Sequence, residues 1–427
     1  MYVVRLRSST HSLKRNDLSI IRMQTYSDHR GSLTSIKEIP FDVKEILISK
    51  NNKGVLRGLH MSPYRKRVFV TSGTIHDFFI NPVTHEKTEI TLSSGEFVDI
   101  PKGWAHGFFS VTDSQIVYLL ENRFDPTLDQ NIFWNDPTLP LERNFPKETL
   151  NISEKDRAAF YARKYDFLVL GARGFLGSHC VDTLRSQGYS VFESNERLEN
   201  IDSIREQILK SRTSFVICAA GISGKPTVEW CETHEKETIQ NNYTAPITLF
   251  KMTEELGIHC TYFGSGLVYA TDKDIYTEED TPTLTSRVYC RWRCELEKMI
   301  PFYKNVLYLR ILYPITGDGH PKCFLTKMLQ RTSSVADTNV SITVVPSLFP
   351  SISELCKKDV TGIYNFVNKN SIRLPRLLEL YGESKERVEF TRVSAGNGFE
   401  LSVDKLSIVV SVEGVEKALY STLQTHV

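Results

Sequence analysis

"DFLVLGARGFLGSHCVDTLRSQGYSVFES", residues 166–194, is the stretch that decides the fold of the second half of the chain. An apolar run ends in a turn that carries Gly171, Gly174 and Gly177, and an amphipathic segment leads to a second apolar run after Gly188. The glycines permit a tight turn and a close approach to a pyrophosphate, and the N-terminus of a helix supplies oriented N–H groups. The stretch predicts a dinucleotide-binding strand, turn, helix and strand; a purely structural turn is the alternative.

The two halves of the chain of 427 residues differ in period. From about residue 25 to 134, short alternating runs such as "KRVFVTSGTIHDFFI" are separated by Gly, Asn, Pro and Ser, which is typical of a jelly roll or barrel. After residue 165, apolar strands alternate with amphipathic helices, which predicts a Rossmann-type α/β domain with a parallel sheet. We expect an all-β domain over residues 1–157, a linker over 158–164 and the α/β domain over 165–427.

Composition excludes several classes of partner. Lys and Arg number 52 against 51 Asp and Glu, so no overall field favours nucleic acid or an anionic membrane. No apolar run approaches the roughly 20 residues that a membrane helix needs. The 8 cysteines lack zinc spacing; Cys290 and Cys294 are one helical turn apart, but no second pair stands nearby to complete a metal site. We therefore expect free thiols, a reducing compartment and a cytoplasmic protein.

The GxxGxxG spacing resembles that of the extended short-chain dehydrogenase/reductase family, and the resemblance continues for some 200 residues. It implies a fourth strand ending in "AAG", a helix asparagine at Asn242, and a catalytic pair at Ser265 in "YFGSGLVYA" and Tyr289. The cofactor, NADPH or NADH, would then contact the turn, the strand end and the helix asparagine: Gly171, Gly174, Phe175, Leu176, Gly177, Ala219, Ala220, Gly221 and Asn242.

Position 293 departs from the family pattern. The family places lysine four residues after the tyrosine, where it lowers the pKa of the phenol and holds the nicotinamide ribose, but "YCRWR" has Arg293 there. Tyr289 and Arg293 would share a helix face, and arginine keeps the positive charge, but its planar fork is not a compact ammonium. A working or weakened reductase is one interpretation; a half that binds nucleotide without strong activity is the other.

Four further stretches narrow the resemblance of the second half. "GISGKPTVEWCETHEKETIQNN", "EEDTP", "RILYPIT" and "VTGIYNF" are similar to the 4-reductases that complete L-rhamnose on a nucleotide carrier. At the end of the second apolar run, Glu193 favours a cofactor with a free ribose hydroxyl. Arg173 in the glycine turn and Arg197 after the run could instead hold a 2′-phosphate. We favour NADPH.

The first half resembles the nucleotide-4-keto-6-deoxyglucose 3,5-epimerases of the cupin superfamily. "KGVLRGLHMSPYRKRVFVTSG" and "DIPKGWAHGFFSV" carry this resemblance, with "SDHRGSL" before them and "FWNDPTLPLE" after them. Metal cupins use an HxH pair, but His60 has no histidine at position 62, so no metal is expected. His76 and His85 are interpreted as a strand and a loop histidine.

The resemblance implies a role for each candidate residue of the first half. His60 would be the base that removes the protons acidified by the C4 ketone, and Asp156 would make it more basic. Tyr118 would return the proton on the opposite face, and Lys66 would stabilise the enolate. Three of these residues also have a structural interpretation: His60 as a core histidine, Tyr118 as a barrel aromatic and Asp156 as a helix cap. The residues implied to bind substrate are Arg30 and Arg57, for the diphosphate, and His106, lining the sugar pocket.

Together the halves predict a bifunctional nucleotide-4-keto-6-deoxyglucose 3,5-epimerase and NAD(P)H-dependent 4-reductase that makes a dTDP- or UDP-linked L-rhamnose. A 6-deoxy-talose product, or a regulatory protein whose second half only binds nucleotide, are the alternatives. The segment before Asp28 has no obvious strand partner within its own sheet, so we also expect a homodimer through residues 1–157.

Overall fold

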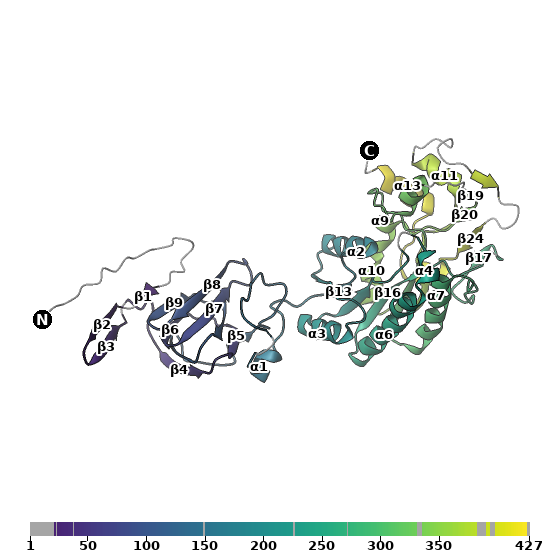
Figure 1. Ribbon diagram of the computed structural model, residues 1–427. Helices are drawn as coiled ribbons and strands as arrows, with labels where there is room; N and C mark the ends of the chain where they lie inside the picture. Colours follow the sequence, from purple (N-terminus) through teal and green to yellow (C-terminus); the bar gives the residue numbers. More distant parts are fainter. Residues whose placement is uncertain are drawn as a thin grey trace. The chain divides into compact units, whose positions relative to one another are not determined.

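The computed structural model describes residues 21–22, 24–36, 38–147, 150–224, 227–270, 272–330, 335–381, 390–392 and 398–424. The chain separates into two compact units, Met1–Arg163 and Lys164–Val427 (Figure 1). The first is built from antiparallel strands and the second from a parallel sheet with helices. The predicted fold class, an all-β jelly roll followed by a Rossmann-type domain, is confirmed.

Two five-stranded antiparallel sheets form the first unit, in the orders β1-β9-β6-β11-β4 and β12-β5-β10-β7-β8. Strands β2 and β3 form a separate hairpin. The elements are β1 (Ile21–Arg22), β2 (Gln24–Asp28), β3 (Gly31–Ser35), β4 (Glu45–Asn51), β5 (Leu56–Met61), β6 (Lys66–Ser72), β7 (Thr74–Ile80), β8 (Lys87–Ser93), β9 (Glu96–Ile100), β10 (Ala105–Ser110), β11 (Ser114–Leu120), β12 (Gln130–Asn131) and α1 (Glu154–Arg157).

Side chains along these strands point alternately to the two faces of each sheet, so one set lies between the two sheets. Val68 and Ile116 of one sheet join Phe79 and Phe108 of the other in a single buried cluster. Because strand side chains alternate with period two, Lys66, two residues before Val68, and Tyr118, two after Ile116, point the same way. The interior between the sheets is thus apolar with polar side chains at selected positions.

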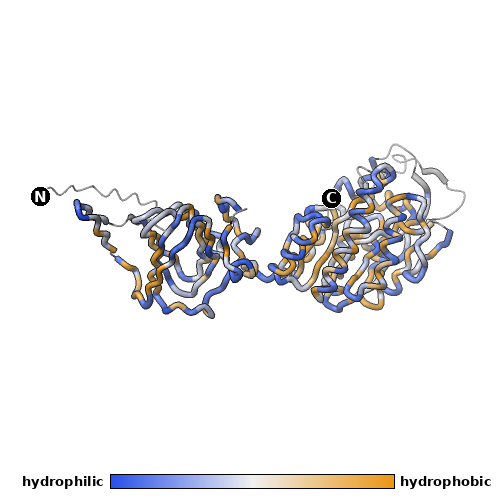
Figure 2. The backbone as a smooth tube through the Cα atoms, turned by 60° about the horizontal axis from the view of Figure 1, so that its bottom comes forward, coloured by the Kyte–Doolittle hydropathy of each residue, from blue (hydrophilic) through white to orange (hydrophobic). Residues whose placement is uncertain are grey.

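The second unit is organised by a six-stranded parallel sheet in the order β14-β13-β15-β16-β18-β21. Its strands are β13 (Phe167–Leu170), β14 (Val191–Ser194), β15 (Phe215–Cys218), β16 (His259–Ser265), β18 (Val306–Ile311) and β21 (Gly362–Asn365). The strands are almost wholly buried, as expected for a sheet covered on both faces, and Figure 2 shows runs of hydrophobic residues in this unit.

Helices and short strands complete the second unit. The helices are α2 (Phe175–Ser186), α3 (Ile201–Ser211), α4 (Trp230–Thr233), α5 (Glu235–Ile239), the π-helical η1 (Gln240–Thr244), α6 (Ala245–Glu255), α7 (Val288–Met299), η2 (Ile300–Phe302), α8 (Phe324–Leu329), α9 (Val345–Leu348), η3 (Phe349–Ser351), α10 (Ile352–Lys357), α11 (Leu374–Leu380), α12 (Asp404–Val409) and α13 (Val415–Gln424). The short strands are β17 (Ile275–Tyr276), β19 (Val335–Asp337), β20 (Asn339–Val340), β22 (Ile372–Arg373), β23 (Phe390–Arg392) and β24 (Gly398–Leu401).

Two candidate active sites

A histidine–carboxylate pair joins strand β5 to helix α1 in the first unit. His60 on β5 places Nε2 2.7 Å from Oδ1 of Asp156 on α1. Asp156 is 4% exposed, whereas the side chain of His60 keeps about a third of its surface open. His60 is also the register partner of His106 on β10, so both side chains lie on the same face of the sheet.

The glycines of the two sequence motifs explain how these strands come so close. Gly58 has φ +108°, and a Cβ there would meet Gly107 Cα and the His106 carbonyl oxygen, each at 2.6 Å. Only glycine tolerates both this backbone conformation and this approach. "GVLRGLH" and "IPKGWAHGF" therefore meet glycine to glycine, and this contact sets the neighbouring histidines side by side.

The carboxylate of Asp156 forms its side-chain hydrogen bond with His60 and does not cap helix α1. The cap of α1 is Ser153, whose hydroxyl accepts the backbone N–H of Asp156, so the carboxylate does not act as the cap. Burial would raise the pKa of Asp156, but the hydrogen bonds from His60 and the Gly58 N–H lower it overall. Asp156 is thus an anion that orients the imidazole of His60.

Lys66 on β6 and Tyr118 on β11 come from the opposite sheet. Burial lowers the pKa of Lys66, against the opposing attraction of Asp129, which makes its ammonium a readier proton donor. Burial, with repulsion from Asp77, raises the pKa of Tyr118, and Arg57 opposes this only in part. The phenol is therefore protonated at neutral pH. The fold thus places the His60–Asp156 pair between β5 and α1, and a buried cation and a phenol on the opposite sheet.

The remaining candidates of the first unit differ in position. His106 is buried and bonds Asp77 at 2.7 Å through Nε2. Arg57 is exposed and donates from Nε to Asn51 Oδ1 at 2.7 Å. Arg30 lies in the turn of the β2–β3 hairpin, 77% exposed and paired with Asp28, and no contact joins it to His60 or Arg57 among the described residues.

Sequence reasoning did not single out Asp77. It is fully buried, holds His106 and leaves Oδ2 without a hydrogen-bond partner among the described residues. The signal was available, because Asp77 is the one carboxylate of the strand "TIHDFFI" and is followed by three apolar residues. Its neighbour His76 faces the other side and contacts Glu89 and Phe145, in agreement with a structural role.

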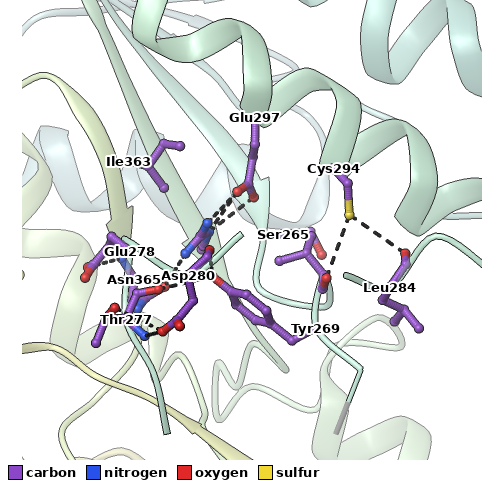
Figure 3. Close-up of polar contacts among 12 residues, drawn as sticks. Ser265, Tyr269, Thr277, Glu278, Asp280, Leu284, Cys294, Glu297, Ile363 and Asn365 are labelled. Carbon is purple, nitrogen blue, oxygen red and sulfur yellow. Dashed lines mark hydrogen bonds and ion pairs between the residues drawn. The ribbon is translucent and has the colours of Figure 1, made fainter. Parts of the chain in front are cut away.

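Metal ligation finds little support in the described part of the chain. No group of three or more His, Cys, Asp or Glu side chains there is arranged to hold a metal ion. Cys290 and Cys294 are both buried, and burial raises the pKa of Cys290 to about 11 and that of Cys294 to about 12. Figure 3 shows the Cys294 thiol directed at two backbone carbonyls, one of them that of Leu284.

The glycine turn of the second unit forms a cradle. Gly171 has φ +73°, and a Cβ there would meet the backbone nitrogen of Ala220 at 2.8 Å. A Cβ on Gly177 would meet the Gly171 carbonyl oxygen at 2.0 Å. Gly174 begins α2 without a side-chain cap, so the first N–H groups of that helix are left for a ligand. This geometry fits a dinucleotide pyrophosphate.

A second set of contacts converges on the end of β15. Asn242 lies in the π-helical segment η1, fully buried; its Nδ2 donates to the Ile222 carbonyl at 2.7 Å and its Oδ1 accepts the Ile222 N–H at 3.0 Å. A Cβ on Gly221 would meet Arg293 Nη2 at 2.9 Å and Asn242 Oδ1 at 3.3 Å. π-Bulges recur at functional sites, and this one fixes the loop that follows β15.

Helix α7 carries Tyr289 and Arg293 on one face, 7% and 4% exposed. Its first N–H, that of Val288, donates to Glu232 Oε1 at 3.1 Å, so the "VEWCE" segment positions the start of α7. Arg293 donates from Nη1 to the phenol oxygen of Tyr262 at 2.8 Å, a partner that the sequence did not indicate.

Ser265 ends β16, and its hydroxyl accepts the Leu267 N–H at 3.2 Å. At the end of β14, Glu193 pairs with Arg185 at 2.6 Å, while Arg173 and Arg197 are exposed. The Glu193 carboxylate, which would bind a free ribose hydroxyl, is thus already paired with Arg185. Arg173 and Arg197 are both open to solvent.

Comparisons with known proteins cover both units. Residues 12–163 match the family model of dTDP-4-dehydrorhamnose 3,5-epimerase, and residues 167–310 match that of the NAD dependent epimerase/dehydratase family. A bifunctional dTDP-4-dehydrorhamnose 3,5-epimerase/dTDP-4-dehydrorhamnose reductase from Arabidopsis thaliana is 32% identical over 225 residues, 51% of this chain and 74% of that protein. The chain belongs to this family of bifunctional epimerase/reductases.

Two further likenesses concern the sequence of the first unit and the fold. The dTDP-4-dehydrorhamnose 3,5-epimerase of Methanothermobacter thermautotrophicus is 35% identical over 161 residues, 32% of this chain and 85% of that one. The crystal structure of a UDP-rhamnose synthase from Acanthamoeba polyphaga mimivirus aligns with a TM-score of 0.55 and 23% identity, over 61% of this chain and all but 1% of that one, which shows a shared fold. No helix among the described residues is long and apolar enough to cross a membrane.

Proposed function

We propose that this enzyme converts a nucleotide-4-keto-6-deoxyglucose into a nucleotide-L-rhamnose in two steps, epimerisation at C3 and C5 followed by reduction at C4. The observation that carries the proposal is the His60–Asp156 pair, with His60 on one sheet of the jelly roll and Asp156 on α1, together with buried Lys66 and partly buried Tyr118 on the facing sheet. A C4 ketone acidifies both neighbouring carbons, and a base, a cation and a phenol are the groups that their epimerisation requires.

In the epimerase step, His60 removes the proton and Asp156 stabilises the imidazolium that forms. Lys66 stabilises the enolate oxygen, and the neutral phenol of Tyr118 delivers a proton from the other face. His106, held by Asp77, lines the sugar pocket, and Arg57 contacts the diphosphate. Reduction must come second, because it removes the carbonyl that makes C3 and C5 acidic.

In the reductase step, NADPH supplies the hydride when bound. Tyr289 donates the proton to the C4 oxygen, which Ser265 also binds, and Arg293 places a positive charge beside the phenol. The turn at Gly171, Gly174 and Gly177, with the residues after them and at the end of β15, holds the dinucleotide. Arg173 and Arg197 are exposed and Glu193 is already paired with Arg185, which favours NADPH over NADH.

A nucleotide-binding second unit without strong reductase activity is the second candidate, because Arg293 replaces the lysine of the family. One experiment separates the two. The purified chain is incubated with dTDP- and with UDP-4-keto-6-deoxyglucose, in deuterated buffer, with and without NADPH. We expect deuterium at C3 and C5 in both conditions and L-rhamnose only with NADPH. Deuterium without cofactor oxidation favours the second candidate, a 6-deoxy-talose product corrects the stereochemistry, and no deuterium refutes the epimerase.

We also propose a homodimer formed by the first unit. The β2–β3 hairpin pairs only with itself among the described residues and exposes Tyr26 and Leu33. Edge strand β4 exposes Ile46 by 59% and Ile48 by 64%. Apolar side chains beside an open strand edge favour association with a second copy.

Light scattering at micromolar concentration tests the dimer. We expect the parent chain to be dimeric, and Ile46→Glu with Ile48→Glu to be monomeric and folded. A monomeric parent would contradict the proposal. For localisation we propose a reducing compartment such as the cytoplasm, because all 8 cysteines are buried free thiols.

A further inference from the structure

Arg293 is a buried cation without a carboxylate partner in the part of the chain that the structure describes. Glu297, the acid one turn after Arg293 on α7, is occupied: Arg310 donates to it from Nε and Nη2, the latter at 2.6 Å, and both side chains are 1% exposed. Figure 3 shows Glu297 engaged in this pair. A buried charge needs compensation by hydrogen bonds or by other dipoles, so the contacts of Arg293 decide what it can do.

Those contacts come from two tyrosines. The phenol oxygen of fully buried Tyr262 accepts from Nη1 at 2.8 Å. The guanidinium carbon lies 5.6 Å from the ring centre of Tyr262 and 5.3 Å from that of Tyr289. Nη2 reaches the end of β15, 2.9 Å from where a Cβ on Gly221 would stand. Nε has no hydrogen-bond partner in the described structure, which leaves a buried donor for a ligand oxygen.

We propose that Tyr262 is a positioning residue that allows arginine to serve where lysine is usual. The Tyr262 hydroxyl accepts a hydrogen bond from Nη1 of Arg293 and so orients the guanidinium plane. In this orientation Nη2 lies at the loop after β15, and Nε remains a donor for a dinucleotide oxygen. Lysine is a compact point charge and needs no such guide, whereas arginine has a plane that must be oriented. This inference rests on the proposed reductase function and assigns Tyr262 no contact with substrate.

The test is a double-mutant cycle between Tyr262→Phe and Arg293→Lys. In the parent, Tyr262→Phe removes a hydrogen bond to a charged group, so we expect kcat/KM for NADPH oxidation to fall about 10- to 100-fold. NADPH affinity, measured by fluorescence titration, should weaken in the same variant. In the Arg293→Lys background, Tyr262→Phe should change either quantity less than about twofold, because a lysine does not depend on the phenol.

The matched control is Tyr308→Phe. Tyr308 is as buried as Tyr262, stacks on it with ring centres 5.7 Å apart and forms no hydrogen bond with Arg293 among the described contacts. Its replacement should cost the same in both backgrounds. Tyr262→His, which keeps an aromatic acceptor, should retain more NADPH affinity than Tyr262→Phe, and thermal melting shows that each variant is folded.

Equal losses from Tyr262→Phe in the arginine and lysine backgrounds would assign Tyr262 to core packing and overturn the proposal, as would no loss in the parent. A parent that binds NADPH without oxidising it would refute the proposed reductase function. The affinity arm of the cycle would then still decide whether Tyr262 positions Arg293.

Discussion

The two active sites solve the same problem, holding a charged group in a buried place, in different ways. In the first unit the ionisable pair is matched, because His60 faces the carboxylate of Asp156 at 2.7 Å. In the second unit the cation Arg293 faces the phenol side chains of Tyr262 and Tyr289. The first arrangement holds an imidazole against a carboxylate, whereas the second holds a guanidinium against two phenols and the loop after β15. From this difference we expect the paired imidazole to act as a base and the site without a carboxylate partner to supply an acid.

The largest effect is expected from His60→Ala, which removes the base of the matched pair. Deuterium incorporation at C3 and C5 should fall by about 2 to 4 orders of magnitude, the range for a positioned acid or base. NADPH affinity should be unchanged, because the cofactor site is in the other unit. His76→Ala is the control, since His76 contacts Glu89 and Phe145 instead of the dyad. Exchange at near the parent rate would refute the role of His60.

Tyr289→Phe removes the proton donor of the unmatched site. NADPH oxidation with the epimerised sugar should fall by about 2 to 4 orders of magnitude, while deuterium exchange continues. Tyr303→Phe, which follows the far end of α7 and packs on Phe250, should behave like the parent. If Tyr289→Phe reduces the sugar normally, the proton comes from another group.

Asp156→Asn removes the negative charge that faces His60 and keeps a side chain of nearly the same shape. Because a neutral amide stabilises the imidazolium of His60 less than a carboxylate does, we expect exchange to slow about tenfold or more. Asp156 has a lowered pKa in the folded state, so it contributes stability above its usual pKa of 3.8 that is lost as the pH falls through the lowered value. Asparagine should therefore flatten the acid dependence of the melting temperature near and below pH 4. An unchanged acid profile would show that the pair is not formed in solution.

Arg293→Lys should have the smallest effect, within about fivefold of the parent in NADPH oxidation, because it restores the compact donor and keeps the charge. Arg293→Ala should lose activity, since the site loses the cation that contacts the Tyr289 ring and reaches the loop after β15. If the parent is inactive and Arg293→Lys is active, the second unit has changed from catalysis to binding.

Much of this could be predicted from local patterns. The alternation of "KRVFV" and the glycine turn at residues 171–177 report on neighbours in sequence, and strand period and turn geometry depend on those neighbours alone. These patterns predicted the fold class correctly. Resemblance then supplied the candidate site residues, and the structure brings His60 to Asp156 and Arg293 to the loop after β15.

The sequence by itself determined the two architectures, the cofactor turn and the identity of the motif residues, because each is written in short-range spacing. Only the tertiary structure decided the partners: Asp77 for His106, Glu232 for the start of α7 and Tyr262 for Arg293. These pairs are 29, 56 and 31 residues apart. No local period encodes them, since they arise only when separate strands and helices pack and each buried polar group must find a hydrogen bond.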